Sequence, residues 1–195
     1  MTLPLFPLQD ILFPGISMPL QIFEPRYLQL VSDSLREGTG FGIVAIKEGK
    51  EVATGQLKPP QIHPFGVEVS IIDWYQQSNN LLGIRVLAER KFQVLEARVQ
   101  DNRLMVAEVE YLPVEPSEPL DDFGHELAKM VEELSEHPVL SLYNLPTIKD
   151  MRMLGWQLAQ LLPIDQATKV ELLAISEPKK RVFEIARWLE RTANE

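Results

Sequence analysis

The spacing of hydrophobic positions changes once along the chain, from a period of two to a period near 3.6. In the first part, compact apolar runs and alternating apolar positions are separated by turn residues, which is typical of strands. We expect strands near residues 3–6, 16–23, 41–46, 67–71, 82–86, 92–94 and 105–111. One helix is predicted over residues 24–37, because Pro25 suits a first helical turn and Gly38 can end the last. The charged residues 89–92 are expected to form a turn, and the proline-rich residues 59–64 an irregular stretch.

Residues 112–121, with the sequence LPVEPSEPLD, separate the two patterns. Proline continues neither a helix interior nor a strand ladder, and acidic side chains favour water, so we predict an exposed linker. After it, helices are predicted near residues 123–134, 147–161, 165–175 and 176–189, the second of them capped by Thr147 with Asp150. The expected fold is therefore α+β, with a strand-rich lobe at 1–112, a linker at 113–121 and a helical lobe at 122–195.

Composition narrows the functional classes. The 195 residues include no cysteine, which excludes disulfides and thiolate metal sites. The net charge of −9 disfavours nucleic-acid binding, because phosphate backbones attract basic surfaces. No apolar run approaches the roughly 20 residues that span a bilayer, and the first residues do not resemble a signal peptide. We therefore expect a cytoplasmic protein that binds neither nucleic acid nor membrane.

Motifs for catalysis are present only as fragments. His125-Glu126 begins like a zinc-protease helix, but Lys129 stands where the second histidine is needed. Gly49-Lys50 resembles the end of a phosphate loop, but Glu51 replaces the hydroxyl residue that binds magnesium. No serine has an evident general base nearby. We expect no catalytic residue, no cofactor and no metal.

The segment Phe23-Glu24-Pro25-Arg26-Tyr27 is less generic, since a carboxylate and a guanidinium flank a helix-starting proline. One interpretation is a structural clasp, with Glu24 at the positive helix end, Arg26 pairing or stacking, and both aromatic side chains in the core. The other interpretation is a ligand contact. We favour the clasp.

Two opening segments resemble a known family. LPLFPLQDILFPG at 3–15, which ends in Pro14-Gly15, and PLQIFEPRY at 19–27 are similar to the N-terminal substrate-binding domain of Lon proteases. Further likeness lies at 41–43, at Gly66, at the charged residues 89–92 and along 162–182, although Ala88 stands where the family more often has glycine. The resemblance implies a PUA-like barrel lobe followed by a helical bundle, in a protein that helps to select damaged or tagged polypeptides. The ATPase and Ser-Lys protease modules of full Lon proteases are not in these 195 residues, so we expect a stand-alone member that is not an enzyme.

The leading hypothesis is a protein that holds unfolded or tagged polypeptide segments in apolar pockets and at an uncovered strand edge, near the junction of the lobes. The candidate contacts are five aromatic residues, namely Phe13, Phe65, Trp74, Tyr75 and Tyr143. One alternative is an adaptor that docks to a partner enzyme, such as a Lon-like protease. Two others are PUA-like RNA binding, which the charge opposes, and a hydrolase with a scattered carboxylate site.

Overall fold

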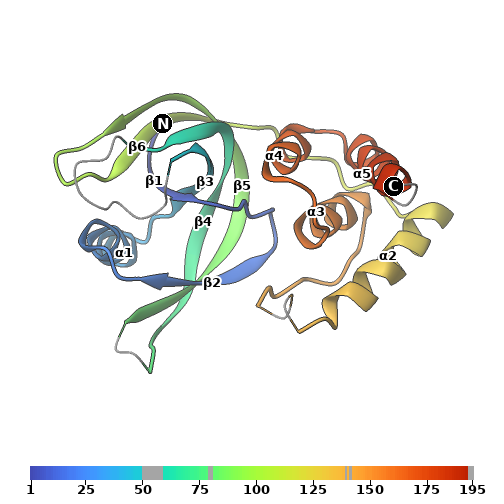
Figure 1. Ribbon diagram of the computed structural model, residues 1–195, viewed down its shortest axis with the longest axis horizontal. Coiled ribbons are helices and arrows are strands. Elements are labelled where there is room, and N and C mark those ends of the chain that lie inside the picture. Colours follow the sequence, from blue (N-terminus) through green and yellow to red (C-terminus); the bar gives the residue numbers. More distant parts are fainter. Residues whose placement is uncertain (50–58, 79–80, 139, 141, 193–195) are drawn as a thin grey trace.

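The computed structural model describes residues 1–49, 59–78, 81–138, 140 and 142–192, and its fold is α+β (Figure 1). The strands and the first helix predicted from the sequence are confirmed. The remaining helices come after the last strand in the chain, as the sequence predicts. In chain order the elements are β1 (Thr2–Leu8), β2 (Ser17–Ile22), α1 (Pro25–Glu37), β3 (Phe41–Glu48), β4 (Gln61–Gln76), β5 (Leu82–Val99), β6 (Met105–Tyr111), α2 (Asp122–Ser135), α3 (Met151–Leu161), α4 (Gln166–Ala174) and α5 (Pro178–Thr192).

The strands form one strongly curled sheet in the order β2-β5-β4-β3-β1-β6, and β5 also pairs with β6. That last pairing closes β5, β4, β3, β1 and β6 into a ring and leaves β2 attached outside it. Only β1 and β3 are parallel; the other pairs are antiparallel. Register shifts in β4 and β5 bend these two long strands, as bulges do. Helix α1 lies on one side of the ring and α2 to α5 lie on the other (Figure 1).

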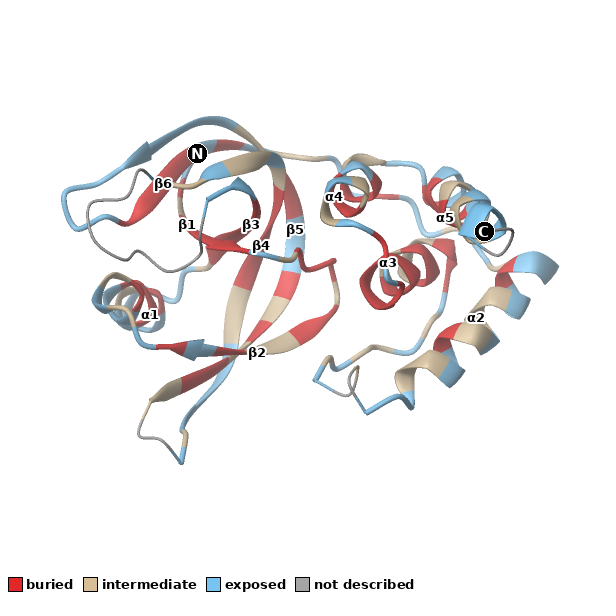
Figure 2. Ribbon diagram, in the orientation of Figure 1, coloured by how far each residue is buried: buried red, intermediate tan, exposed pale blue. Residues whose placement is uncertain are grey.

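Strand β3 is buried on both faces, which explains why its sequence is a compact apolar run rather than an alternating one. Successive side chains of a strand point to opposite faces. Val44 belongs to a small cluster with Leu5 and Phe92, whereas Ile43 and Ala45 belong to the main core. That main core continues through α1 and the inner faces of α3 and α4, where Figure 2 shows buried positions.

Helix α1 begins at Pro25 and ends where Gly38 adopts the left-handed conformation (φ 64°), a geometry that glycine reaches without steric cost. Its buried face contains Tyr27, Leu30 and Val31. Leu35 stands at helical spacing from Tyr27 and Val31 but does not share this buried face, since its side chain is exposed.

Two local predictions about the strands are wrong. Residues 89–92 form no turn, because β5 runs through them, with Arg90 opposite Glu68 and Phe92 opposite Gly66. The stretch 59–64 is not irregular throughout, because Pro64 lies inside β4. The β3–β4 register shifts beside Pro64, so the missing N–H interrupts no regular ladder.

The segment 113–121 is not solvated along its whole length. Glu115 is buried, so the prediction that the acidic residues of this segment face water is wrong for Glu115. Its carboxylate forms ion pairs with Lys91 of β5 and Arg181 of α5. The division at 1–112, 113–121 and 122–195 stays a prediction.

Aspartates begin three of the later helices. Asp121, Asp150 and Asp165 each accept a hydrogen bond from a backbone N–H of the first turn. The prediction that Thr147 caps the second of these helices is wrong, because α3 begins after Asp150.

Candidate polypeptide-binding surface

The five aromatic candidates lie in different environments. Phe13 is fully buried, and its N–H donates to the side chain of Gln160 at 3.1 Å. The prediction that Phe13 contacts a client is therefore wrong; its backbone links the segment between β1 and β2 to α3. Phe65 is half-buried and packs against the main core.

Tyr143 is half-buried between the strands and the helices. Its hydroxyl lies 3.5 Å from the Asp10 carboxylate, to which it donates. Burial raises the pKa of Tyr143 to about 12, and the negative charge of Asp10 acts in the same direction. A phenol that stays neutral in this way is suited to holding the loop before α3 in place. We therefore do not include Tyr143 in the binding surface.

We expect Tyr143 to make stability depend on pH in alkaline solution. Its folded pKa of about 12 exceeds the ordinary value of 10.0, so the folded state retains the proton longer than the unfolded state. The resulting stabilisation is complete below pH 10.0 and is lost as the pH rises through the folded value. Denaturant unfolding between these pH values should show a steeper loss of stability in the wild type than in Tyr143→Phe. If stability falls equally steeply with pH in the wild type and in Tyr143→Phe, burial of the Tyr143–Asp10 pair is contradicted.

Trp74 and Tyr75 lie near the end of the β4–β5 hairpin, which projects beyond α1 and β2 (Figure 1), and as successive residues of a strand they point to opposite faces of it. Trp74 is 63% exposed, Tyr75 36% and the neighbouring Ile72 48%. Trp74 extends a cross-strand row whose other members, Leu20 and Ile84, are buried. The core face of the sheet therefore continues past the part that α1 covers and presents an indole ring to solvent.

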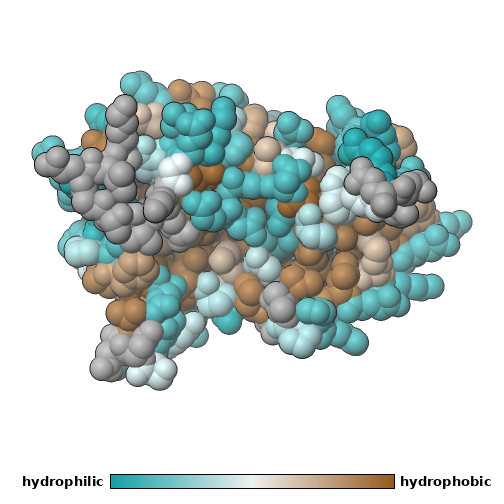
Figure 3. Space-filling view, in the orientation of Figure 1, coloured by the Kyte–Doolittle hydropathy of each residue, from teal (hydrophilic) through white to brown (hydrophobic). Residues whose placement is uncertain are grey.

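Phe23 adds a fourth apolar side chain to this end of the sheet. It follows Ile22, which pairs with Leu82, and Leu82 in turn pairs with Gln76 of β4. The prediction that Phe23 lies in the core is wrong, because its side chain is 50% exposed. We define the hairpin surface as Phe23, Ile72, Trp74 and Tyr75, the exposed apolar side chains on the two faces of this end of the sheet. In the space-filling view, hydrophobic side chains gather over α1 and β2 beside the hairpin (Figure 3).

The rest of the Phe23–Tyr27 segment is tied down by polar contacts. Arg26 pairs with Glu24 at 3.0 Å, donates to the backbone carbonyl of Arg103 at 2.9 Å, and stacks on the ring of Tyr27. These contacts fit the clasp interpretation for Glu24, Pro25, Arg26 and Tyr27, and leave Phe23 alone as a ligand candidate.

The other family-motif pair, Pro14 and Gly15, forms a turn next to β5. Gly15 has φ 79°, a left-handed conformation that disfavours other residues, and its N–H donates to the carbonyl of Ala88 at 2.8 Å. This pair lies at the entry to β2, which fits the structural role expected for it.

Strands β2 and β4 each present an edge of the sheet near the hairpin surface. The two edges differ in whether their backbone groups are free to pair with another strand. On β2, the N–H and carbonyl of Ser17 already bond to Asn144, and Pro19 has no N–H to offer. On β4, pairing with β3 ends at Val69, and within the described residues no strand pairs with that side of 70–76. The backbone N–H of Trp74 points away from β5. It donates a hydrogen bond to the carboxylate of the neighbouring Asp73, with 2.8 Å between the nitrogen and Oδ1. The edge of β4 is thus the better template for an added strand.

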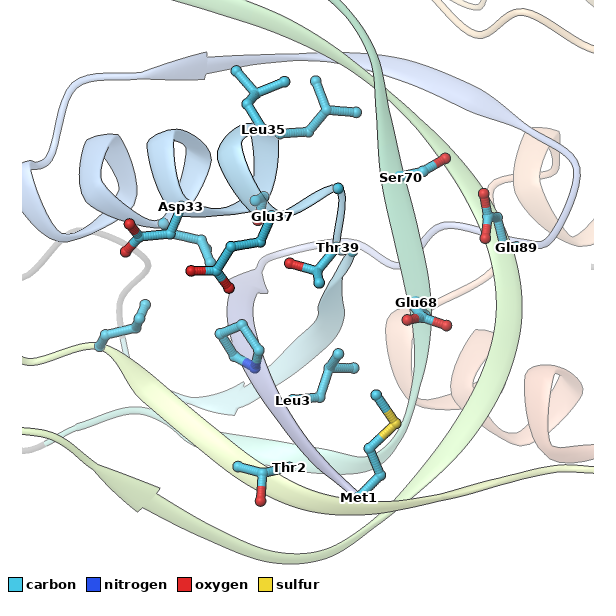
Figure 4. Close-up of a pocket in the computed structure, with 17 residues that line it drawn as sticks. Met1, Thr2, Leu3, Asp33, Leu35, Glu37, Thr39, Glu68, Ser70 and Glu89 are labelled. Carbon is cyan, nitrogen blue, oxygen red and sulfur yellow. The ribbon is translucent and has the colours of Figure 1, made fainter.

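A hollow of about 800 Å³ lies between the C-terminal end of α1, the start of β1 and residues 68–71 of β4. Its floor is apolar and includes Leu3, Leu30 and Leu104. Acidic side chains from α1, β4 and β5 line it on opposite sides (Figure 4), and they are Asp33, Glu37, Glu68 and Glu89. Because Ser70 and Ile71 also line the hollow, it reaches the start of the free edge of β4.

The described residues give no sign of a metal centre or membrane segment. Among them, no group of three or more histidine, aspartate or glutamate side chains is arranged to hold a metal ion. No helix in the described part combines the length and the apolar character needed to cross a bilayer.

Comparison with known proteins assigns the class. The chain is similar in structure to a Lon N-terminal domain protein from Xanthomonas campestris, with a TM-score of 0.77, 32% identity and coverage of 96% of this chain and 98% of that one. The N-terminal domain of a Mycobacterium avium complex Lon protease shares the fold at a TM-score of 0.65 and 15% identity, over 96% of this chain and 97% of that one. The family model for the ATP-dependent protease La (LON) substrate-binding domain matches residues 2–191. The chain belongs to this family.

Two curated relatives are much longer than this chain. A Lon protease from Amoebophilus asiaticus is 26% identical over 188 residues, which are 92% of this chain and 22% of the relative. Protein cereblon from Xenopus tropicalis is 26% identical over 118 residues, which are 57% of this chain and 24% of cereblon. The chain spans about a quarter of the length of these relatives, and the matched part of the family is its substrate-binding domain. This family membership supports a role in binding polypeptides.

Proposed function

We propose that this chain is a non-catalytic protein that holds extended segments of unfolded or tagged polypeptides on the hairpin surface and along the free edge of β4. The supporting observation is the projection of Trp74, with Ile72 and Tyr75, beside an unpaired strand edge in a member of a substrate-binding family. We also propose that the ring of strands corresponds to the PUA-like lobe implied by the family resemblance, and the helices to its bundle, in a cytoplasmic protein.

The energetics favour modest affinity. A client strand gains apolar contacts with the hairpin surface and main-chain hydrogen bonds with β4, but it loses conformational freedom and has to displace Asp73 from the N–H of Trp74. Dissociation constants roughly in the micromolar range are expected from this balance. For an uncharged client, raised salt should change binding little, because apolar burial is not screened.

Replacing Trp74 with alanine should weaken client binding about tenfold, since half-burying a large aromatic side chain contributes roughly 1.4 kcal/mol. The measurement is fluorescence anisotropy of a labelled, uncharged unfolded polypeptide, with a folded protein of equal size as the negative control. Phe183→Ala is the matched variant: its side chain is also 60% exposed, but it lies on α5, across the molecule from the hairpin (Figure 1). It should bind as the wild type does.

Other outcomes would support the alternatives. Equal weakening by both variants, or no binding of several unfolded polypeptides by the wild type, would contradict the proposal. One stable folded partner, such as a Lon-like protease, would then support the adaptor role. Tight RNA binding that falls steeply with salt would support the RNA-binding alternative.

A further inference from the structure

We infer that the hollow beside α1 selects clients that carry lysine or arginine next to apolar residues. This inference rests on the proposed polypeptide binding and adds a preferred sequence chemistry to it. The hollow lies at one end of the β4 edge, with Ile71 as its last β4 residue and Trp74 three residues further along. A strand advances about 3.3 Å per residue, so a client strand paired here spans both places within a few residues.

The lining of the hollow suits the two parts of a long basic side chain. Leu30, Leu35 and Pro4 offer apolar surface for an aliphatic stem, and the carboxylates of Asp33 and Glu37 stand at the end of α1 beside it. Lysine and arginine side chains commonly lie this way, with the stem on apolar surface and the charge in water.

The charge of the hollow also points to a basic occupant. Four carboxylates line it, and none of the described residues that line it is a lysine or arginine; the ammonium of Met1, which also lines the hollow, donates to the carbonyl of Val109. Asp33 and Glu37 pair with Arg36, which is 66% exposed, whereas Glu68 is only 9% exposed and accepts two hydrogen bonds from Arg90. A client cation beside Asp33 and Glu37 therefore meets negative charge without first breaking a buried ion pair.

Electrostatic attraction from such a partly exposed site should be moderate and sensitive to salt. Two peptides of identical apolar sequence are compared, one with lysine and one with glutamine at two positions. At low ionic strength the lysine peptide should bind about fivefold more tightly to the wild type, from two contacts of roughly half a kcal/mol each. In about 1 M salt the two affinities should converge, because the screening length falls to about 3 Å.

The variant that tests the hollow is Asp33→Asn with Glu37→Gln. Both side chains are exposed by more than a third, so their replacement should not disturb the helix. This variant should bind both peptides equally, at the affinity of the wild type for the glutamine peptide. Glu184→Gln on α5 is the control, since it removes an equally exposed carboxylate elsewhere, and should keep the fivefold preference.

The outcomes separate this inference from the proposed function. If the wild type binds both peptides equally at low salt, selection of basic clients is wrong and polypeptide binding stands. A lysine preference that survives Asp33→Asn with Glu37→Gln would overturn the role of the hollow. If neither peptide binds, the proposed function itself fails.

Discussion

Replacing Glu115 with glutamine should lower the free energy of unfolding by about 3–5 kcal/mol, the usual cost of removing one partner of a buried ion pair. The Glu115 carboxylate accepts hydrogen bonds from both terminal nitrogens of Arg181, at 2.8 and 2.5 Å, and pairs with the Lys91 ammonium. The three side chains are almost completely buried. Without the carboxylate, two positive charges would face each other inside the protein. Denaturant unfolding measures the effect.

The matched control is Glu118→Gln, three residues further along the same segment. Glu118 pairs with Lys179 at 3.8 Å, and both are partly exposed, so its loss should cost less than about 1 kcal/mol. Adding Lys91→Met to Glu115→Gln should restore part of the stability, because it removes one of the two facing charges. If the free-energy changes of Glu115→Gln and Lys91→Met are additive, the two side chains do not interact, which would contradict the three-residue cluster.

The pH dependence of Glu115→Gln gives a second, independent readout. Burial lowers the pKa of Lys91 below 10.5 even though Glu115 opposes this shift. In the variant that opposition is gone, so the folded protein releases the Lys91 proton at a lower pH than the unfolded chain does. Between the lowered value and 10.5 the unfolded state binds more protons, and stability therefore rises with pH. The deficit relative to the wild type should shrink as the solution becomes alkaline.

The cluster of Lys91, Glu115 and Arg181 was not predictable from the sequence, and the reason is physical. Its members are 24 and 66 residues apart, so no local periodicity links them. A basic pair between apolar strands is most often a turn, and a glutamate between prolines is most often solvated. One signal was present: residues 82–94 contain no glycine or proline after Gly83, as a continuous strand allows.

The general architecture was predictable because hydrophobic period and turn chemistry agree over most of the chain. The alternation at Val67, Val69, Ile84 and Val86 and the buried run of β3 gave the strands, and the caps at Asp121 and Asp165 are local signals. A barrel lobe was expected from the family resemblance alone; the pairs that close the ring were not predictable from the residues, because β1 pairs over long range with both β3 and β6.

The candidate surface was predictable only in part. Trp74, Tyr75 and Phe13 were all proposed from residue type. Whether the side chains of Trp74 and Tyr75 are exposed depends on where the β4–β5 hairpin extends beyond α1. Phe23 shows the opposite error, in which a residue that was expected to be buried is exposed. It precedes a buried helix start and was expected inside, yet it lies past the last buried position of β2.

Replacing Gly66 with alanine should destabilise the ring by about 3 kcal/mol or more, because overpacking a filled core costs about 1–3 kcal/mol and here one of the contacts is backbone. An added methyl group at Gly66 would lie 2.5 Å from the carbonyl oxygen of Ile43 and 2.6 Å from both the Phe92 ring and a methyl of Val44. The phenyl group of Phe92 and the backbone of β3 occupy the space that a side chain would need, so β3 and β4 would have to move apart.

Gly38→Ala separates this steric effect from the general cost of replacing glycine. Gly38 is in the left-handed conformation, but an added methyl group there meets no atom within 4 Å. It should therefore cost about 1 kcal/mol, from backbone strain alone. Calorimetric or denaturant unfolding of both variants gives the comparison. If Gly66→Ala proves no more costly than Gly38→Ala, the packing of Phe92 against β4 is looser than these contacts require, and the ring does not depend on the absence of a side chain at Gly66.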